Sequence, residues 1–553
     1  MGELTNPPDA RSRIPAVTDD EKRTRQRPGW ARRGLAAGSG VLAGVASLGV
    51  AELASAAVRP EASPVVAVGG AAIDRTPAAV KDWAIRHFGT EDKTVLQLGI
   101  LAVLMLFALA LGAAALRFRR TGAAGVMVFG VVGAAAALNR PDSTGPTDAL
   151  PSLAGALAGA AVLFLLVGRL TRPGRAGEAA DVPEVPSSGE GWDRRGFVVA
   201  ATAAAAASVG AGVLGRSLNG ARGHAAVASR ASITLPRPAS PAAAVPRGAG
   251  LAIAGISPFV TSNSDFYRVD TALVVPKVDA STWRLRLHGK GVARPRTLSF
   301  DDLLRRDLVE RDITLTCVSN EVGGPYVGNA RWIGVRLADL LAECGVEPPS
   351  RGGPADQLVA RSVDGMTIGS PVEDVMDGRD ALLALGMNGT PLPFAHGFPV
   401  RMVVPGLYGF VSACKWIKEI ELTTFDSYDP YWVKRGWARR APIKTGSRID
   451  TPKPFARPTA GRVMVAGTAW AQHRGIDRVE VRVDDGLWQP ARLAAEDTAD
   501  TWRQWSFPWQ ATQGGHTLTV RATDRTGARQ TDKRTRTIPD GASGWHSVVV
   551  TVD

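Results

Sequence analysis

The sequence predicts three kinds of structure in one chain: an all-α membrane region, an α+β domain and a C-terminal β-sandwich. Residues 1–215 are dominated by Ala, Gly, Leu and Val, whereas the remainder alternates apolar and charged residues as soluble domains do. At 553 residues the chain is also too long for one domain. We expect a basic cytoplasmic arm, a membrane region, a linker, an α+β domain and a β-sandwich, over residues 1–33, 34–215, 216–250, 251–450 and 451–553.

Five apolar stretches predict about five transmembrane helices. They cover residues 34–58, 95–116, 122–138, 150–168 and 196–215, and Glu52 is their one charged residue. Most approach the roughly 20 residues that cross a bilayer. The alternative is a buried bundle of Ala-rich soluble helices. We disfavour it because core helices of soluble proteins carry a polar face, which these stretches lack.

Cationic residues predict the orientation of the membrane region. Arginines and lysines gather in residues 11–33, 117–120 and 169–195, all on one side of a five-span topology. By the positive-inside rule that side is the cytoplasm, and everything after residue 215 lies outside. We therefore expect a multi-pass protein of the cell membrane with residues 216–553 on the extracytoplasmic side. Residues 59–94 also carry a few cations, which weakens the pattern.

The run WDRRGFVVA, residues 192–200, resembles a twin-arginine export signal, which would imply a cargo that folds around a cofactor before export. Positive-inside bias alone also explains the two arginines. The formal net charge of +13 lies largely in the arm and loops, and no nucleic-acid-binding motif is present, so we expect no nucleic-acid partner.

The segment after residue 255 has the signals of an α+β domain. Residues 283–289 alternate apolar and basic side chains, as a strand does, and Ser299 is placed to cap a short helix. A second strand, DITLTCVSN, ends at a Gly-rich loop. Residues 335–346 predict a helix that ends at Gly345, with Cys344 packed in the core. After residue 452, short alternating strands and turns predict a β-sandwich.

Four separate segments carry residues with the chemistry of a cofactor site. Cys317 ends a strand beside the Gly-rich loop, NSDFYR occupies 263–268, His396 and Arg401 lie five residues apart, and Lys415 follows in YGFVSACKW. Cations, hydrogen-bond donors and a thiolate suit a phosphorylated, sulfur-bound metal cofactor. Taken singly, however, Cys317 also fits a core residue and His396 a hydrogen-bonded loop histidine.

Together these segments resemble the sulfite oxidase family of molybdenum enzymes. The resemblance rests on TCVSNEVGG, on MNGTPLPFAHGFPVRMVVPGLYGFVSACKW, and on GTAWA, RVEVRVDDGLW and VRATD in the last domain. It covers nearly all of residues 255–553, and HGFPVR with the KW pair is its most specific part. It implies a sulfite-oxidase-type molybdopterin-binding domain followed by an immunoglobulin-like dimerisation domain.

The resemblance implies a role for each matching residue. Cys317 would bind molybdenum beside the dithiolene of a single pyranopterin, and soft thiolate ligation suits such a centre. Arg268 and Tyr428 would act with it in catalysis, although Tyr431 competes with Tyr428. The implied cofactor contacts are Asn263, Phe266, Tyr267, Asp364, His396, Arg401, Ala413, Cys414 and Lys415.

The sequence departs from the sulfite-oxidising pattern next to Arg268. Sulfite oxidases have a histidine just after this arginine, whereas this chain reads YRVDT with Asp270. A carboxylate near the site would disfavour a sulfite dianion through like-charge repulsion. Sulfoxide reduction and sulfite-type oxidation of a small substrate both remain open.

The partners follow from the same resemblance. None of the seven histidines lies in a predicted membrane stretch, so we expect no haem in this chain and a separate electron carrier, either a cytochrome or quinone-linked. The last domain implies a homodimer. An alternative function is a non-catalytic membrane scaffold that keeps the fold, which retention of Cys317 disfavours.

Overall fold

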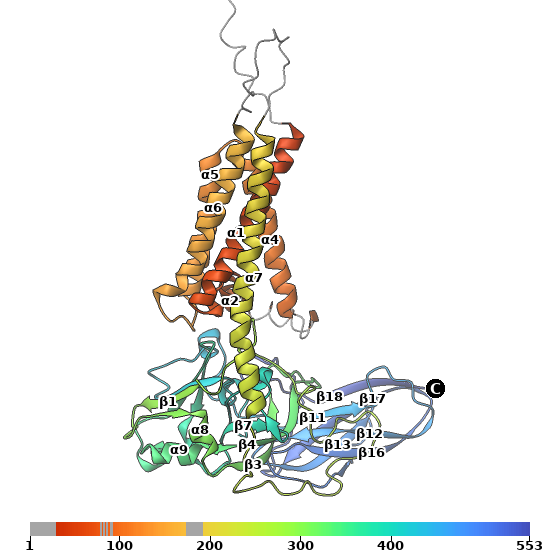
Figure 1. Ribbon diagram of the computed structural model, residues 1–553. Helices are drawn as coiled ribbons and strands as arrows, with labels where there is room; N and C mark the ends of the chain where they lie inside the picture. Colours follow the sequence, from red (N-terminus) through yellow and green to blue (C-terminus); the bar gives the residue numbers. More distant parts are fainter. Residues whose placement is uncertain (1–28, 78–79, 81–82, 84–86, 89–91, 173–191) are drawn as a thin grey trace, which may run out of the picture.

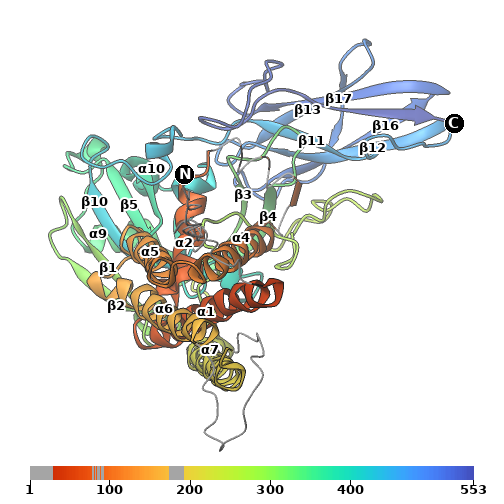
Figure 2. The ribbon, with the colours of Figure 1, turned by 90° about the horizontal axis from the view of Figure 1, so that it is seen from above.

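A computed structural model describes residues 29–77, 80, 83, 87–88, 92–172 and 192–553. Figures 1 and 2 show a bundle of long helices that stands on the α+β domain, while the β-sandwich projects to one side. The first and the last of the long apolar helices both begin at the end of the bundle that is far from the α+β domain (Figure 1). The bundle therefore meets the α+β domain rather than the β-sandwich.

Five helices of the bundle are long and apolar enough to cross a membrane. They are α1 (Trp30–Ala57), α4 (Asp92–Ala115), α5 (Arg119–Leu138), α6 (Leu150–Thr171) and α7 (Arg194–Ser232). Small residues let their backbones approach closely, as is usual between membrane helices. A Cβ on Gly40 would lie 1.9 Å from the Ala108 carbonyl oxygen, and one on Gly155 would lie 2.4 Å from that of Ser47. The five apolar stretches of the sequence are thus confirmed as helices.

Two features of the bundle differ from the sequence prediction. The segment between the first two stretches contains a further helix, α2 (Pro64–Arg75), with proline at its start. The linker predicted over 216–250 is wrong in its first part, because α7 continues as a helix to Ser232. Its many alanines favour a helix even where no apolar stripe exists. Arg230 fixes the last turn of α7 by donating to the carbonyl oxygens of Leu392 and Pro391, at 2.7 Å each.

The α+β domain contains two five-stranded sheets. One has the order β2-β1-β10-β5-β6, and the other has the order β3-β4-β7-β8 with β9 paired to β7. The strands are β1 (Arg284–Gly289), β2 (Arg296–Ser299), β3 (Val309–Thr316), β4 (Val327–Arg336), β5 (Gln357–Ser362), β6 (Thr367–Pro371), β7 (Leu382–Met387), β8 (Thr390–Pro391), β9 (Arg401–Val403) and β10 (Ile417–Thr423). The short helices are α8 (Phe300–Leu304), α9 (Leu337–Glu343), α10 (Val372–Met376) and α11 (Gly409–Ser412).

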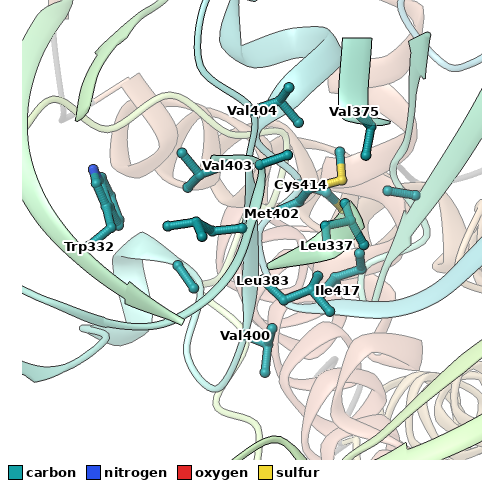
Figure 3. Packing of buried hydrophobic residues seen from close by; sticks show 14 of the residues in the cluster. Trp332, Leu337, Val375, Leu383, Val400, Met402, Val403, Val404, Cys414 and Ile417 are labelled. Atoms are coloured by element: carbon teal, nitrogen blue, oxygen red, sulfur yellow. The ribbon is translucent and has the colours of Figure 1, made fainter. Parts of the chain in front are cut away.

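A continuous apolar core joins these two sheets. Figure 3 shows part of it, with Trp332, Met402 and Ile417 among the packed side chains. Cys344 is fully buried in the same core, as the sequence predicts. The Ser299 cap is confirmed as well, since its hydroxyl accepts a hydrogen bond from the Asp302 amide, 3.1 Å away. The core holds the loops at the strand ends in fixed positions.

The C-terminal domain is a sandwich of two four-stranded sheets, ordered β11-β12-β16-β15 and β14-β13-β17-β18. Its strands are β11 (Gly446–Thr451), β12 (Gly461–Trp470), β13 (Ile476–Val483), β14 (Gln489–Pro490), β15 (Arg492–Leu493), β16 (Arg503–Ala511), β17 (Gly514–Asp524) and β18 (His546–Val552). The sandwich is bonded to β3. Gln472 donates to the Thr314 carbonyl at 3.0 Å, and the Trp502 amide donates to the Thr314 hydroxyl at 2.7 Å. The predicted fold class is thereby confirmed.

Candidate active site

A cavity of about 350 Å³ lies where the α+β domain meets the helical bundle. It gathers most of the residues that the sequence analysis singles out. Those that line it are Phe266, Tyr267, Cys317, Asp364, His396, Arg401, Ala413, Cys414 and Lys415. They come from six separate stretches of the α+β domain, so the fold brings together what the sequence holds apart.

Cys317 stands at the inner wall of this cavity, one residue after β3 ends at Thr316. Its backbone amide donates to the Tyr326 carbonyl at 2.9 Å, which closes the Gly-rich loop. The Ser319 amide points at the sulfur from 3.4 Å. Burial raises the pKa of the thiol, whereas the Ser319 amide and the Lys415 ammonium lower it. The sulfur is therefore held as a thiol by burial, beside two groups that favour the thiolate a metal would need.

His396 closes the short turn at Phe394–His396, and Gly397, with φ of 111°, lets the chain leave that turn. Its Nε2 lies 2.9 Å from the carbonyl oxygen of Asn263. Burial, together with the positive charge of Arg401, lowers the pKa of His396 to about 4. The imidazole is neutral at pH 7, so its Nε2 carries the proton that it donates to Asn263.

Arg401 is a buried cation at the start of β9, with 6% of its surface exposed. One Nη donates to the His396 carbonyl at 3.2 Å, and the guanidinium lies 4.9 Å from the centre of the Trp332 ring. Among the described residues, none accepts a hydrogen bond from its buried Nε. Burial lowers its pKa to about 10, so the side chain is still charged at pH 7.

Asp270 offsets part of the positive charge of two cations near the cavity, Lys415 and Arg268. Its Oδ2 lies 2.9 Å from the Lys415 Nζ and 3.0 Å from the Arg268 Nε, and its side chain is 3% exposed. Lys415 also donates to the Ala395 carbonyl at 3.2 Å. The carboxylate thus cancels positive charge where an anionic substrate would need it.

Burial raises the pKa of three further ionisable groups that line the cavity. Burial raises the pKa of Asp364, whose Oδ1 accepts from the Met366 amide at 3.3 Å. Burial also raises the pKa of the Tyr267 hydroxyl. The thiol of Cys414 lies among apolar side chains of the core (Figure 3), and burial raises its pKa too. Burial thus favours the protonated form of all three groups.

Three predicted site residues do not line the cavity. The Asn263 carbonyl accepts a hydrogen bond from His396, and the Arg268 guanidinium donates to the Asp270 carboxylate. The Tyr428 hydroxyl contacts Thr367 at 3.3 Å, and Tyr428 is outside the cavity lining. Its competitor Tyr431 donates instead to Asp74 of α2, 2.5 Å away.

Sequence reasoning missed the apolar part of the wall. Phe410, Met366, Trp432 and Trp437 line it from the α+β domain, while Ile73, Thr76, Val80 and Leu96 line it from the helical bundle. The aromatic pairs Trp432–Trp437 and Phe410–Trp437 have ring centres 5.9 and 5.5 Å apart. No motif marks these positions, since their type is that of any core residue.

The residues present fit the phosphorylated, sulfur-bound metal cofactor that the sequence predicts. A buried guanidinium with an unsatisfied Nε is the group that a phosphate would satisfy. Cys317 supplies a soft sulfur ligand in the same cavity, and His396 and Lys415 also line it.

Comparison with known proteins supports the same family. The model described as the oxidoreductase molybdopterin binding domain matches residues 272–432, and a bacterial Ig domain model matches residues 447–520. Mitochondrial sulfite oxidase of Mus musculus is 32% identical over 293 residues, which cover 46% of this chain and 53% of the relative. The human enzyme is 31% identical over 305 residues, covering 47% and 55%. The chain thus spans about half the length of these relatives.

Two other matches are shorter or more distant. The uncharacterized oxidoreductase YuiH of Bacillus subtilis (strain 168) is 32% identical over 162 residues, 29% of this chain and 75% of the relative. Among solved structures, the sulfane dehydrogenase SoxCD of Paracoccus pantotrophus covers 53% of this chain and 83% of its own, with a TM-score of 0.45 and 24% identity. The matched segment of residues 272–432 contains Cys317, His396, Arg401 and Lys415, and the chain belongs to the sulfite oxidase family of molybdopterin-dependent oxidoreductases.

Proposed function

We propose that this protein is a membrane-anchored molybdopterin oxidoreductase that removes the oxygen atom from a small neutral sulfoxide outside the cytoplasm. The family gives the cofactor and the class of chemistry. The choice between sulfoxide reduction and sulfite-type oxidation rests on one observation, the ion pairs of Asp270.

The chain's own residues have distinct roles in holding the cofactor. Cys317 would bind the molybdenum, Arg401 would hold the phosphate of the pterin, and His396 and Lys415 would hold its ring system and tail. When bound, the cofactor supplies two-electron oxygen-atom transfer. Because His396 is neutral, the net positive charge offered to the phosphate comes from Arg401 and Lys415.

Asp270 selects against an anionic substrate. In this chain the Arg268 guanidinium, the group that would attract sulfite in the sulfite-oxidising pattern, is bonded to a nearly buried carboxylate. The same carboxylate is bonded to Lys415. The single carboxylate offsets one of these two positive charges, so a dianion at the cavity would meet one net positive charge from this cluster instead of two, whereas a neutral sulfoxide would lose nothing.

Sulfoxide reduction also consumes two protons, and the cavity contains groups able to deliver them. Asp364 lines the wall with its pKa raised by burial, so it keeps its proton at a higher pH than an ordinary aspartate. Its Oδ2 is the atom from which we expect a proton to leave.

The membrane location and the orientation are part of the proposal. They are supported by the five long apolar helices and by the arginines at the end of the bundle that lies far from the α+β domain. Arg169 pairs with Asp193 there, and Arg119 donates to the Phe164 carbonyl at 2.6 Å. Labelling of single surface cysteines in intact cells would test the orientation. Reaction at a cysteine in place of Asp426 but not of Arg120 is expected, and the reverse pattern would refute it.

Two steady-state assays on the purified full-length protein test the chemistry. A reduced dye with methionine sulfoxide measures reduction, and sulfite with an artificial acceptor measures oxidation. We expect turnover in the first assay to exceed turnover in the second. Faster oxidation of sulfite would select the other direction, and protein that carries neither molybdenum nor pterin after native expression would favour the scaffold alternative.

A further inference from the structure

The active-site cavity has walls from two parts of the chain. Ile73 and Thr76 at the end of α2 and Leu96 near the start of α4 line the same cavity as Cys317 and Trp432. In the sequence, more than 200 residues separate these two groups. The membrane region is therefore a part of the site's wall and does more than anchor it.

Specific contacts hold α2 against the segment that carries Trp432. The Tyr431 hydroxyl donates to Asp74 at 2.5 Å, and Arg435 lies 3.9 Å from the same carboxylate. On the other side, a Cβ on Gly69 would lie 2.6 Å from the Leu273 side chain. These contacts put the shared wall in a fixed place.

A second contact joins the bundle to the loop of Asp364. Gly365, with φ of 82°, lies so close to the turn after α5 that a Cβ would come within 2.3 Å of the Asp142 amide nitrogen. That turn is itself fixed, because Asp142 pairs with Arg59 and with Arg140 at 2.8 and 2.7 Å. The loop that carries a cavity carboxyl group is thus packed directly on the membrane region.

The shared wall is apolar and lies at the level where the bilayer would begin. Leu96 falls in the first turns of α4, a helix with the length and hydropathy of a membrane span. Its neighbours Val95 and Leu98 are 41% and 62% exposed. Trp83 and Phe88, in the segment that precedes α4, are also exposed, with ring centres 5.6 Å apart. Exposed aromatic and aliphatic side chains at the end of a span are typical of the membrane interface.

The part of the cavity lined by Ile73, Leu96 and Trp432 is here called its outer half. It suits a flat ring with polar substituents. Trp432, Trp437 and Phe410 offer aromatic faces, while Thr76 offers a hydroxyl group and Asp364 a carboxyl group. The end of the cavity lined by Ile73 and Leu96, here called its mouth, suits a hydrocarbon tail that stays in the bilayer. A molecule with these features, and with two electrons to exchange, is a membrane quinone.

We propose that the outer half of this cavity, between Ile73, Leu96 and Trp432, binds a membrane quinol that gives its two electrons directly to the site. This inference rests on the proposed function and replaces the separate electron carrier with a site in the chain itself. The electrons and atoms balance: one quinol and one sulfoxide give one quinone, one sulfide and one water. The quinol releases the two protons that the water takes up, and Asp364 stands in the wall to pass them.

The test measures binding of a short-chain quinone separately from turnover. Full-length protein in lipid nanodiscs is titrated with decylubiquinone, and quenching of tryptophan fluorescence reports occupancy near Trp432 and Trp437. The variants Ile73→Trp and Leu96→Trp fill the mouth from the membrane side. Leu98→Trp is the matched control, because Leu98 is on the same helix but is exposed and lies outside the cavity lining.

We expect saturable quenching in the wild-type protein and in Leu98→Trp, and affinity at least tenfold weaker in Ile73→Trp and Leu96→Trp. Turnover driven by decylubiquinol should fall with the affinity in these two variants, whereas in Leu98→Trp both quinol-driven and dye-driven turnover should stay within about twofold of the wild-type values. The pterin content should stay within about twofold in all four proteins. Equal affinity in all four proteins would refute the site.

Failure of this inference is distinguishable from failure of the proposed function. Wild-type protein that turns over with dye but shows no saturable quinone binding would refute the quinone site alone. Quinone binding without sulfoxide turnover, in protein that contains molybdenum and pterin, would refute the function alone. Displacement of the quinone by decanol at equal concentration would mean that the mouth binds any hydrocarbon chain, and would also overturn the site.

Discussion

Replacement of Asp270 by asparagine should shift the substrate preference toward anions. Asp270 is nearly buried and bonds both Lys415 and Arg268, so its single negative charge offsets one of their two positive charges at the cavity. Asparagine keeps the shape and one acceptor oxygen but removes the charge. Lys415 retains its bond to the Ala395 carbonyl, so we expect the local structure to persist.

The size of the effect follows from the distance between charges. An anion about 6 Å from the Lys415 ammonium gains about 3 kcal/mol at an effective dielectric constant of about 20. This corresponds to about a hundredfold in affinity. Water in the cavity screens part of it, so we expect the KM for sulfite to fall by at least tenfold, with the KM for methionine sulfoxide changed by less than about threefold.

The assay compares kcat/KM for sulfite and for methionine sulfoxide in the wild-type protein and in Asp270→Asn. Asp426→Asn is the control, because the Asp426 side chain is fully exposed and distant from the cavity lining. An unchanged ratio of the two kcat/KM values in Asp270→Asn would refute the electrostatic reasoning. An equal fall in both would mean that Asp270 supports the fold rather than the selection of substrate.

Three further predictions concern the cofactor, the pH dependence and the contact with the membrane region. Arg401→Gln removes the buried cation that the phosphate needs, so the purified protein should contain less than about a tenth of the wild-type pterin; wild-type content would contradict the assignment. His396, with its pKa lowered to about 4, does not take the proton that the unfolded chain binds below pH 6.5, so stability should fall between pH 6.5 and 4 by about 3 kcal/mol. Urea unfolding at pH 7 and pH 4.5 should show a smaller fall for His396→Gln, and an equal fall would refute this. Tyr431→Phe removes the bond to Asp74, so amide exchange of residues 64–75 should accelerate by about tenfold, whereas Tyr428→Phe should leave it unchanged.

The helices of the membrane region could be predicted because a span must be apolar all around. The same criterion failed for the end of α7, which is Ala-rich and exposed and is fixed by the contact of Arg230 with Leu392 and Pro391. It also failed for α2, whose place depends on Asp74 and Tyr431. Contacts between distant segments leave no periodic pattern in either segment.

The inner half of the site could be predicted because its chemistry is local to short motifs. Cys317, His396 and Arg401 each stand at a strand end or turn, where the Gly-rich sequence shows that backbone and ligand approach. The outer half could not, since Ile73 and Leu96 are ordinary apolar residues until the fold places them opposite Trp432. Tyr428 was assigned from a loose likeness, and its hydroxyl faces Thr367 instead.

The central claim is that Cys317 binds the metal of a molybdenum–pterin cofactor. The most direct measurement is metal and pterin analysis, with electron paramagnetic resonance of the Mo(V) state, of the wild-type protein, Cys317→Ser and Cys344→Ser. Cys344 is a buried cysteine of the core outside the cavity, so it controls for the loss of a buried thiol. We predict stoichiometric molybdenum in the wild-type protein and in Cys344→Ser, with the spectrum altered or the metal lost in Cys317→Ser alone. Equal metal content and identical spectra in all three proteins would show that Cys317 is a core residue and not a metal ligand, and would contradict the account.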